Sequence, residues 1–276
     1  MSRALCLLHA NCQGEALCRM LEATPAFAAR FHIRYYANYQ QECPTDAELA
    51  QCALLLYQPL GEHWGALASA CLLQKLPPHA QAVPLPNLFF KGCWPFWTHS
   101  TVINFQDSLL EKLRENASDD AMIQHVYLHG RLAEQADLDG IAEESLQQAG
   151  LREQEIPIKT AGVIRADWRE RQLFFTINHP APVLLELVAD ALLALLGLGT
   201  AARDYALPDY YTTFHLPVHP QVARHFHLRW APEGKRYPAF GRMVSCAEYV
   251  SAYLTCRRRG IDALPEMLTA AGLPPA

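Results

Sequence analysis

Residues 7–21 of the chain read LLHANCQGEALCRML, and this stretch decides the fold. The apolar run that begins at Ala4 and ends at His9 predicts a buried strand. A short polar turn follows, and the apolar residues after it are spaced as on one face of a helix: Ala16, Leu17, Met20 and Leu21. A strand that turns sharply into a helix is typical of the α/β class.

The same alternation continues along the first hundred residues. Apolar or alternating runs predict further strands at 31–39, 53–60 and 80–90, and helical spacing predicts helices at 46–52 and 64–76. Strands separated by helices form a parallel sheet whose two faces are both covered. We therefore predict an α/β fold with an open, mostly parallel sheet flanked by helices.

Beyond residue 100 the pattern becomes mostly helical and more charged, which predicts a helical insertion or cap at about 100–160. A strand is expected at 171–180, followed by a long helix at about 182–197. A last helix within 243–260 is expected to end at its final glycine. Because no repeat or low-complexity linker is present, residues 1–276 are expected to form a single α/β domain.

Composition narrows the class of protein. With 51% hydrophobic and 18% charged residues in a chain of 276, there is enough apolar material for a large core. The net charge of −5 gives no basic footprint of the kind that nucleic-acid-binding proteins show, so no nucleic-acid partner is expected. The most apolar stretch, 182–199, contains Glu186 and Asp190, which favours a buried helix over a membrane span.

The cysteine and histidine patterns favour neither disulfides nor a metal. Nine cysteines are present, and no pair has the C-x-x-C spacing, which suits a protein of the reducing cytoplasm. The N-terminal residues pass from a short apolar run directly into a polar turn, unlike a signal peptide. Four histidines lie within 215–227, but prolines break their spacing and no carboxylate is near, so no metal site is predicted.

Polar residues follow the predicted strands at the ends where open parallel sheets bind ligands. After the first, third, fourth and late strands come Asn11, Cys12 and Gln13, then Gln58, then Asn87, then Asn178 and His179. The carboxyl ends of parallel strands share one edge of the sheet. We therefore predict that these amides, the thiol and the imidazole face one crevice.

Cys12 is the predicted reactive group of that crevice. At the start of a helix, the macrodipole and the free backbone N–H groups favour an anion, so we expect a lowered pKa for the Cys12 thiol. The same N–H groups, with the amides of Asn11 and Gln13, are placed to hold an oxyanion. His179 is the predicted general base, which takes a proton from Cys12 or from a substrate hydroxyl.

Structural roles explain the same residues without any chemistry. Asn11 is a good helix cap, Cys12 fits as a small inert residue, and the His179 ring can lie in solvent beside the next helix. His9, a rival base, is expected to pack in the sheet. Lys91 and the glycine after it fit a phosphate contact, or a hydrophobic loop with one extended lysine.

Four motifs in the same order resemble the WcbI-type polysaccharide biosynthesis family, whose members are assigned to acetyl transfer in capsule assembly. They are ANCQGEAL at 10–17, LPNLFFKG at 85–92, FFTINHP at 174–180 and LPVHPQVARHF at 216–226. The resemblance implies an α/β enzyme that binds coenzyme A or acetyl-CoA and acetylates a sugar hydroxyl. It implies Cys12 and His179 as catalytic residues. The cofactor-binding residues that we predict are Asn11, Gln13, Gly14, Asn87, Lys91, Gly92 and Asn178.

The chain departs from the family pattern at one place. A Tyr-His-Pro step is expected after Gly92, whereas this chain has Cys93, Trp94 and Pro95. If relatives use that histidine in catalysis or binding, the substrate or activity of this protein differs from theirs.

The hypothesis that results is acetyl transfer from acetyl-CoA to a sugar or polysaccharide hydroxyl, either directly or through acetylated Cys12. One alternative is an SGNH-type esterase with a cysteine nucleophile, although Thr176 stands where those enzymes have an aspartate. The other is a non-catalytic protein that binds a nucleotide or a sugar. The expected partners are a small-molecule acyl donor and a sugar acceptor, with no metal.

Overall fold

A four-stranded sheet, parallel throughout, occupies the N-terminal part of the chain, with the strand order β2-β1-β3-β4. The strands are β1 (Ala4–Ala10), β2 (Phe31–Ala37), β3 (Cys52–Tyr57) and β4 (Gln81–Pro84). The central strands are apolar along their length and buried, as expected for a parallel sheet covered on both faces. The predicted fold class is confirmed.

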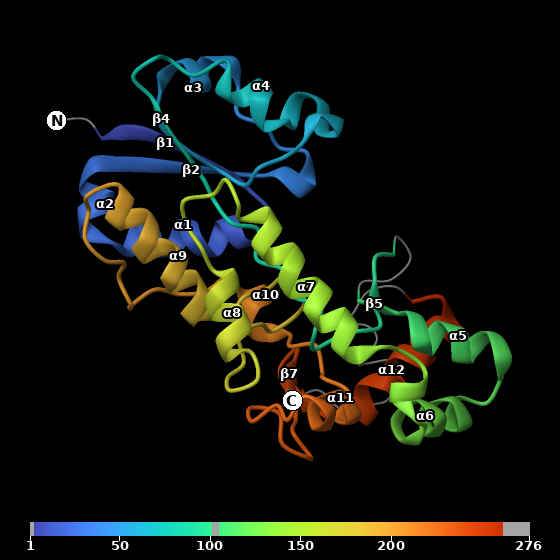
Figure 1. Cartoon of the computed structure of the whole chain (residues 1–276). Coiled ribbons are helices and arrows are strands. Elements are labelled where there is room, and N and C mark those ends of the chain that lie inside the picture. The colour runs from blue at the N-terminus through green and yellow to red at the C-terminus, as the bar shows by residue number, and fades with distance from the viewer. Residues whose placement is uncertain (1–2, 101–104, 262–276) are drawn as a thin grey trace. The chain divides into compact units, whose positions relative to one another are not determined.

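Helices cover both faces of this sheet (Figure 1). On one face lie α1 (Gln13–Ala23), α2 (Pro25–Arg30) and α9 (Pro182–Leu195), and on the other lie α3 (Asp46–Gln51) and α4 (Ser69–Leu73). Alternate strand residues serve the two faces. Leu7 and Leu55, for example, pack with Leu49 of α3 and Leu72 of α4 in one fully buried cluster.

The direction of strand succession reverses at β1. From β1 the chain crosses through α1 and α2 to β2, then returns through α3 to β3 on the other side of β1, and continues through α4 to β4. The carboxyl ends of β1 and β3 are therefore adjacent, and the segments that follow these two strands lead to opposite faces of the sheet. Ligands of doubly wound sheets bind at such a point.

The computed structural model describes residues 3–100 and 105–261, which divide into two compact units. The first contains the residues up to Phe89, Gln148–Arg165 and Asn178–Pro208. The second contains Phe90–Gln147, Ala166–Ile177 and the residues from Asp209 on. Each unit is described by itself below, and the single-domain assignment stays a prediction.

Helices and two short hairpins form the second unit. The hairpins pair β5 (Trp97–Thr98) with β6 (Gln106–Asp107) and β7 (Tyr237–Ala239) with β8 (Arg242–Val244). The helices are α5 (Ser108–Asn116), α6 (Asp120–His129), α10 (Asp209–Thr213), α11 (Pro220–His225) and α12 (Cys246–Arg259). Helices α7 (Leu138–Arg152) and α8 (Ala161–Asp167) have residues in both units. Short 3-10 helices are η1 (Asn38–Gln40), η2 (Glu62–Leu67) and η3 (Leu132–Glu134).

Two predicted elements differ from the structure. The strand expected at 171–180 is not formed, and the apolar residues there, such as Phe174 against Phe90, pack as aromatic pairs instead of in a pleat. The helix expected at 64–76 is divided into η2 and α4 at Ala68, which has φ −55° and ψ 136°, and Gly65 interrupts η2 itself with φ 58° and ψ −123°. The last helix ends as predicted, with Gly260 in the left-handed conformation at φ 68°.

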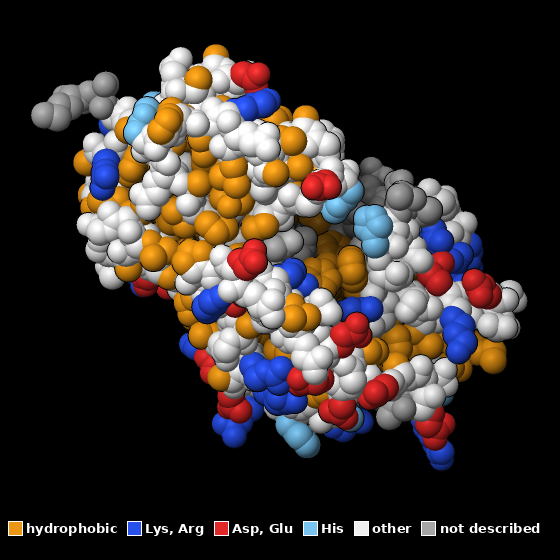
Figure 2. All heavy atoms as spheres, turned by 45° about the horizontal axis from the view of Figure 1, so that its top comes forward, with side chains coloured by type: hydrophobic (Ala, Val, Ile, Leu, Met, Phe, Trp, Pro, Cys, Tyr) orange, Lys and Arg blue, Asp and Glu red, His pale blue; other side chains and the backbone are white. Residues whose placement is uncertain are grey.

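Charged side chains of both signs are interspersed on the face of the molecule in Figure 2. This mixture agrees with the composition, in which 28 acidic residues slightly outnumber 23 basic ones. Among the helices of the described residues, none combines the length and the apolar character that crossing a membrane requires.

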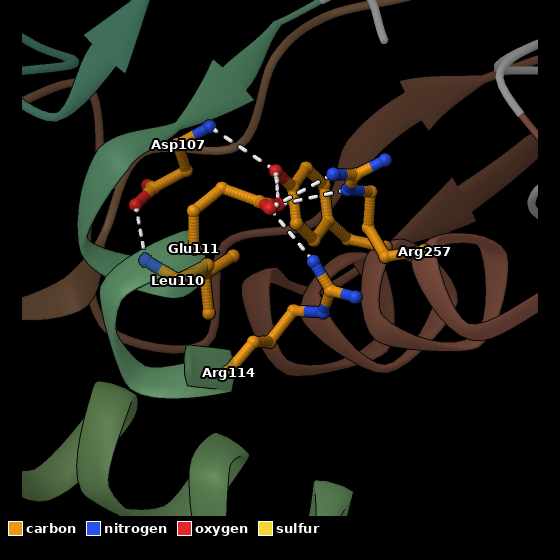
Figure 3. A network of polar contacts seen from close by, with 6 residues as sticks. Asp107, Leu110, Glu111, Arg114 and Arg257 are labelled. Carbon is orange, nitrogen blue, oxygen red and sulfur yellow. Dashed lines mark hydrogen bonds and ion pairs between the residues drawn. The ribbon is translucent and has the colours of Figure 1, made fainter. Parts of the chain in front are cut away.

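A network of polar contacts joins α5 to α12 in the second unit (Figure 3). The Glu111 carboxylate accepts two hydrogen bonds of 2.9 Å from Arg257 and one of 2.7 Å from Arg114. The Tyr253 hydroxyl also donates to Glu111. Asp107 caps α5 by accepting from the Leu110 N–H at 2.9 Å. One carboxylate thus holds three side chains from two helices.

Replacing Glu111 with glutamine is expected to lower the free energy of unfolding by about 2 kcal/mol, because Arg114 and Arg257 lose their shared counter-charge in a half-buried place. Urea unfolding followed by circular dichroism measures the loss. Glu115→Gln is the matched control, since Glu115 is exposed on the same helix. Equal stability of the two variants would contradict the structural role of Glu111.

Candidate active site

The turn after β1 is held by its own hydrogen bonds. The Asn11 Oδ1 accepts from the Gln13 N–H at 2.9 Å, so it satisfies the first N–H of helix α1, although the N-cap residue is Cys12. Its backbone carbonyl accepts from the Tyr35 hydroxyl at 2.7 Å. Cys12 occupies the position before the helix with φ −52° and ψ −23°. The thiol therefore stands at the N-terminus of α1.

Gln13 is the hydrogen-bonding centre of the site. Its side chain is 4% exposed. The Oε1 atom accepts from Gln58 Nε2 at 3.0 Å and from the Leu88 N–H at 3.1 Å. The Nε2 atom donates to the Leu88 carbonyl at 2.6 Å and to the Asn178 carbonyl at 2.8 Å. Both donors and both acceptor positions of the amide are in use. Gln13 therefore positions the loops, and its amide has no donor left for an oxyanion.

Gln58, after β3, completes this arrangement. Its Oε1 accepts from the Asn11 N–H at 2.9 Å, and its Nε2 also donates to the Pro86 carbonyl at 3.2 Å. A cavity of about 20 Å³ lies beside Gln13 and Gln58, with room for about one water molecule. Two buried glutamines thus tie together the segments that follow β1, β3 and β4.

Asn178 brings the late Asn-His-Pro turn to the opening turn. Its Nδ2 lies 3.9 Å from the Cys12 Sγ, in addition to the bond that its carbonyl accepts from Gln13. Asn87 joins from a third segment, because its Oδ1 accepts from Asn11 Nδ2 at 3.2 Å. The structure therefore gathers five of the predicted site residues in the first unit: Asn11, Cys12, Gln13, Asn87 and Asn178. His179 follows Asn178 directly and is half-buried like it.

The electrostatics of Cys12 differ from the prediction. Burial raises the pKa of the Cys12 thiol to about 11, and the nearby Glu15 carboxylate adds to the increase. The N–H groups of Cys12 and Gln13 act in the opposite direction, as the helix N-terminus should, but they are outweighed. The predicted lowering of the Cys12 pKa was wrong, because desolvation destabilises the half-buried thiolate by more than these N–H groups stabilise it.

Alkylation of Cys12 by iodoacetamide is expected to be slow at neutral pH. With a pKa of about 11, its thiolate fraction lies about a hundredfold below that of a thiol at the usual 9.0. Mass spectrometry of the Cys12 peptide between pH 7 and 11 should show a rate that rises throughout. A rate that reaches its plateau below pH 8 would mean that the thiol is activated after all.

Gly14 has a packing role in the same turn. A Cβ atom at this position would lie 2.5 Å from Cε2 of Tyr35 and 2.8 Å from Cβ of Ala10. The absence of a side chain lets helix α1 approach strand β2 closely. Its predicted contact with a cofactor stays a prediction.

Lys91 and Gly92 belong to the second unit. The Lys91 N–H donates to the Ser145 hydroxyl at 2.9 Å, and Gly92 lies against the ring of Phe90, where a Cβ would not fit. Their predicted role in binding the cofactor stays a prediction. Cys93 and Trp94, which replace the expected Tyr-His step, are both buried.

The other histidines have structural surroundings. His9 is fully buried in β1 and packs in the sheet as expected, and burial lowers its pKa. His219 lies 2.9 Å from the Tyr127 carbonyl through Nε2 and accepts from the Gln221 N–H through Nδ1. His215 stacks on Phe175 with 3.9 Å between ring centroids. Within residues 3–100 and 105–261, no three metal-ligating side chains are grouped.

Sequence reasoning missed the part that Tyr35 plays in the site. Tyr35 pairs with Leu8 in the parallel register of β1 and β2, which brings its hydroxyl to the Asn11 carbonyl. The alternating aromatic pattern predicted the strand, but only the register reveals this contact. Gln58 was recognised as a strand-end residue, although its link to Gln13 was not.

This fold and this site define a doubly wound α/β protein whose strand-end loops bring a thiol, several amides and a histidine-bearing turn to one place. The chain belongs to the WcbI family of polysaccharide biosynthesis enzymes, whose family model matches residues 5–201. The predicted family is confirmed, and the protein is an enzyme of polysaccharide biosynthesis. No curated protein matches the chain in sequence.

One solved structure, of WcbI, is similar to the chain over nearly its whole length. The TM-score is 0.70 at 19% sequence identity, with 99% of this chain and 91% of the other covered. That protein is described as a novel polysaccharide biosynthesis enzyme, in its native form without a disulfide bond between coenzyme A and one of its cysteines. At this identity the likeness establishes the fold.

Proposed function

We propose that this enzyme transfers an acetyl group from acetyl-CoA to a sugar hydroxyl during polysaccharide assembly. The observation that carries the proposal is the 3.9 Å contact between Asn178 Nδ2 and Cys12 Sγ. Through this contact the Asn-His-Pro turn lies against the N-terminus of α1. A general base, backbone N–H donors and a thiol are the groups that acyl transfer from a thioester uses.

The description of the similar structure supports coenzyme A as the donor. It refers to a cysteine and coenzyme A as possible disulfide partners in that protein. In this chain Cys12 is the cysteine at the strand-end site, half-buried and in contact with Asn178. We propose that the coenzyme A sulfur lies beside Cys12, and that Asn11, Asn87 and Asn178 contact the cofactor.

The raised pKa of Cys12, about 11, favours direct transfer over an acetyl-enzyme. In the direct route His179 removes the proton from the sugar hydroxyl while that oxygen attacks the acetyl carbonyl carbon. The positive end of the α1 dipole stabilises the tetrahedral oxyanion, since the Gln13 N–H already donates to Asn11 Oδ1. The carbon–sulfur bond then breaks, and the proton held by His179 passes to the departing thiolate. Cys12 remains protonated and packs against the reacting sulfur.

Release of free coenzyme A thiol in the presence of acetyl-CoA and candidate sugars tests the proposal. The Cys12→Ala variant is expected to keep at least a tenth of the native transfer rate, since no bond forms to Cys12 in the direct route. Complete loss, together with an acetylated Cys12 peptide in the native enzyme, would establish the acetyl-enzyme route instead. Fast, saturable hydrolysis of an aryl acetate without coenzyme A would favour an esterase.

Capsule assembly in the cytoplasm is the setting that we propose. Acetyl-CoA is a cytoplasmic metabolite, and within the described residues no disulfide joins any of the nine cysteines, as suits a reducing compartment. The acceptor is then a sugar or saccharide precursor, which presents the hydroxyl to His179.

A further inference from the structure

The second unit contains a large cavity that the proposed transfer does not use. It has a volume of about 900 Å³, which is within the range of sites for cofactors and other small molecules. Its wall is formed by the end of α6, helix α11, the loop that leads from α11 to β7, and the start of α12. All of these elements belong to one unit.

Positive charge predominates on this wall. Arg131, Arg224 and Lys235 line the cavity together with one carboxylate, that of Glu233. Arg131 pairs with Glu134 at 2.9 Å, but its side chain is 83% exposed and that pair is weak. Within the described part of the chain, Arg224 makes no ion pair. Two histidines, 129 and 227, also line the cavity.

Lys235 is a half-buried cation whose contacts are all to neutral groups. Its Nζ donates to Gln172 Oε1 at 2.9 Å and to the Trp230 carbonyl at 2.8 Å, and it lies over the rings of Trp230 and Tyr237. Burial lowers the pKa of Lys235 to about 8, the direction expected of an ammonium that is removed from water with little counter-charge beside it. An anion in the cavity would supply the missing counter-charge.

The start of α12 adds a second feature that favours an anion. Ser245, Cys246 and Ala247 line the cavity, so the N-terminus of this 14-residue helix is part of its wall. Backbone N–H groups and the helix dipole favour negative charge there. Glu248 closes a capping box at this terminus: its carboxylate accepts from the Ser245 N–H at 2.6 Å and pairs with Arg236 at 2.9 Å, so it offsets part of the positive charge there.

We propose that this cavity binds a small molecule through its phosphate group. Two such molecules suit an enzyme of polysaccharide biosynthesis: a sugar phosphate, or the adenosine phosphates of coenzyme A. Arginine and lysine side chains with a helix N-terminus are the combination that recognises phosphate in both. Binding of a sugar phosphate here goes beyond acetyl transfer, whereas binding of the coenzyme A phosphates would rest on the proposed function.

Isothermal titration calorimetry of the whole protein tests this inference. The probes are glucose 1-phosphate for the sugar phosphate, adenosine 3′,5′-bisphosphate for the coenzyme, and uncharged glucose as the control ligand. At least one phosphate probe is expected to bind, and its affinity should fall when salt is added. The probe that binds more tightly identifies the source of the phosphate. Binding of neither probe, or equal binding of glucose, would overturn the proposal.

Substitutions then locate the bound phosphate. Arg224→Ala and Lys235→Gln are each expected to weaken the binding at least about tenfold, because each removes a charged hydrogen-bond donor. Arg229→Ala is the matched control: Arg229 is exposed, lies in the same segment and is outside the cavity wall. If Lys235→Gln fails to fold, the exposed pair Arg131→Ala/Arg224→Ala replaces it. Native affinity in the arginine variants would contradict the assignment.

Discussion

Replacing His179 with alanine is expected to lower kcat for acetyl transfer by about 10²–10⁴-fold, the range that removal of a general base produces. In the proposed mechanism His179 both accepts the hydroxyl proton and returns it to the leaving thiolate. The KM for acetyl-CoA should change little, because both proton transfers take place after acetyl-CoA has bound. Initial rates of coenzyme A release at saturating acceptor measure the effect.

A matched control variant shows that the loss of kcat is specific to His179 and does not follow from removing any histidine. His63 is exposed in η2 of the same unit, so His63→Ala should behave like the native enzyme. If His179→Ala kept more than half of the native kcat while remaining folded, another group would have to be the base, and the proposed mechanism would fail.

Gln13→Leu is expected to have the largest effect on stability, a loss of about 3–5 kcal/mol in the free energy of unfolding. Leucine has nearly the same size but removes four hydrogen bonds from a place that is 4% exposed. The N–H and carbonyl of Leu88, the Gln58 amide and the Asn178 carbonyl would each lose a partner. Urea unfolding, followed by fluorescence, gives the difference.

Gln51→Leu provides the comparison, because Gln51 is exposed at the end of α3 and its replacement should change stability by less than about 0.5 kcal/mol. A second variant, Gln13→Glu, keeps the shape and the acceptor oxygens but loses the donors to Leu88 and Asn178. It should be destabilised as well. If both Gln13 variants unfolded like the native protein, the buried amide would not be the centre of this site.

Local sequence patterns predicted most of the fold. The strands predicted from the apolar runs at β1 and β3 and from the alternating run at β2 are all formed. Burial and pleating produce patterns of apolar residues that can be recognised in the sequence. The run at 171–180 has a similar pattern of apolar residues, but its side chains form aromatic pairs, such as Phe174 with Phe90. Aromatic clusters and strands cannot be told apart from spacing alone.

The candidate site was predictable in its membership and less so in its roles. The rule that ligands bind at strand ends grouped Asn11, Cys12 and Asn87 in advance, whereas Asn178 joins them although the strand expected before it is not formed. The Gln13 amide uses all its hydrogen-bonding positions because carbonyl groups from distant segments reach it. Only tertiary packing determines which carbonyl groups these are. The pKa of Cys12 was mispredicted for the same reason, because burial is a property of the folded chain.

The bond from Gln13 to the Asn178 carbonyl connects residues that are 165 positions apart. Synthesis from the N-terminus delivers the first strand and its helix long before that carbonyl exists. A nascent chain on the ribosome can pair its early strands, yet the buried amide has to wait for the late turn before its last partner arrives. The surroundings of the thiol therefore cannot be completed before residue 178 has been synthesised, and shortened translation products that stop before it should be inactive.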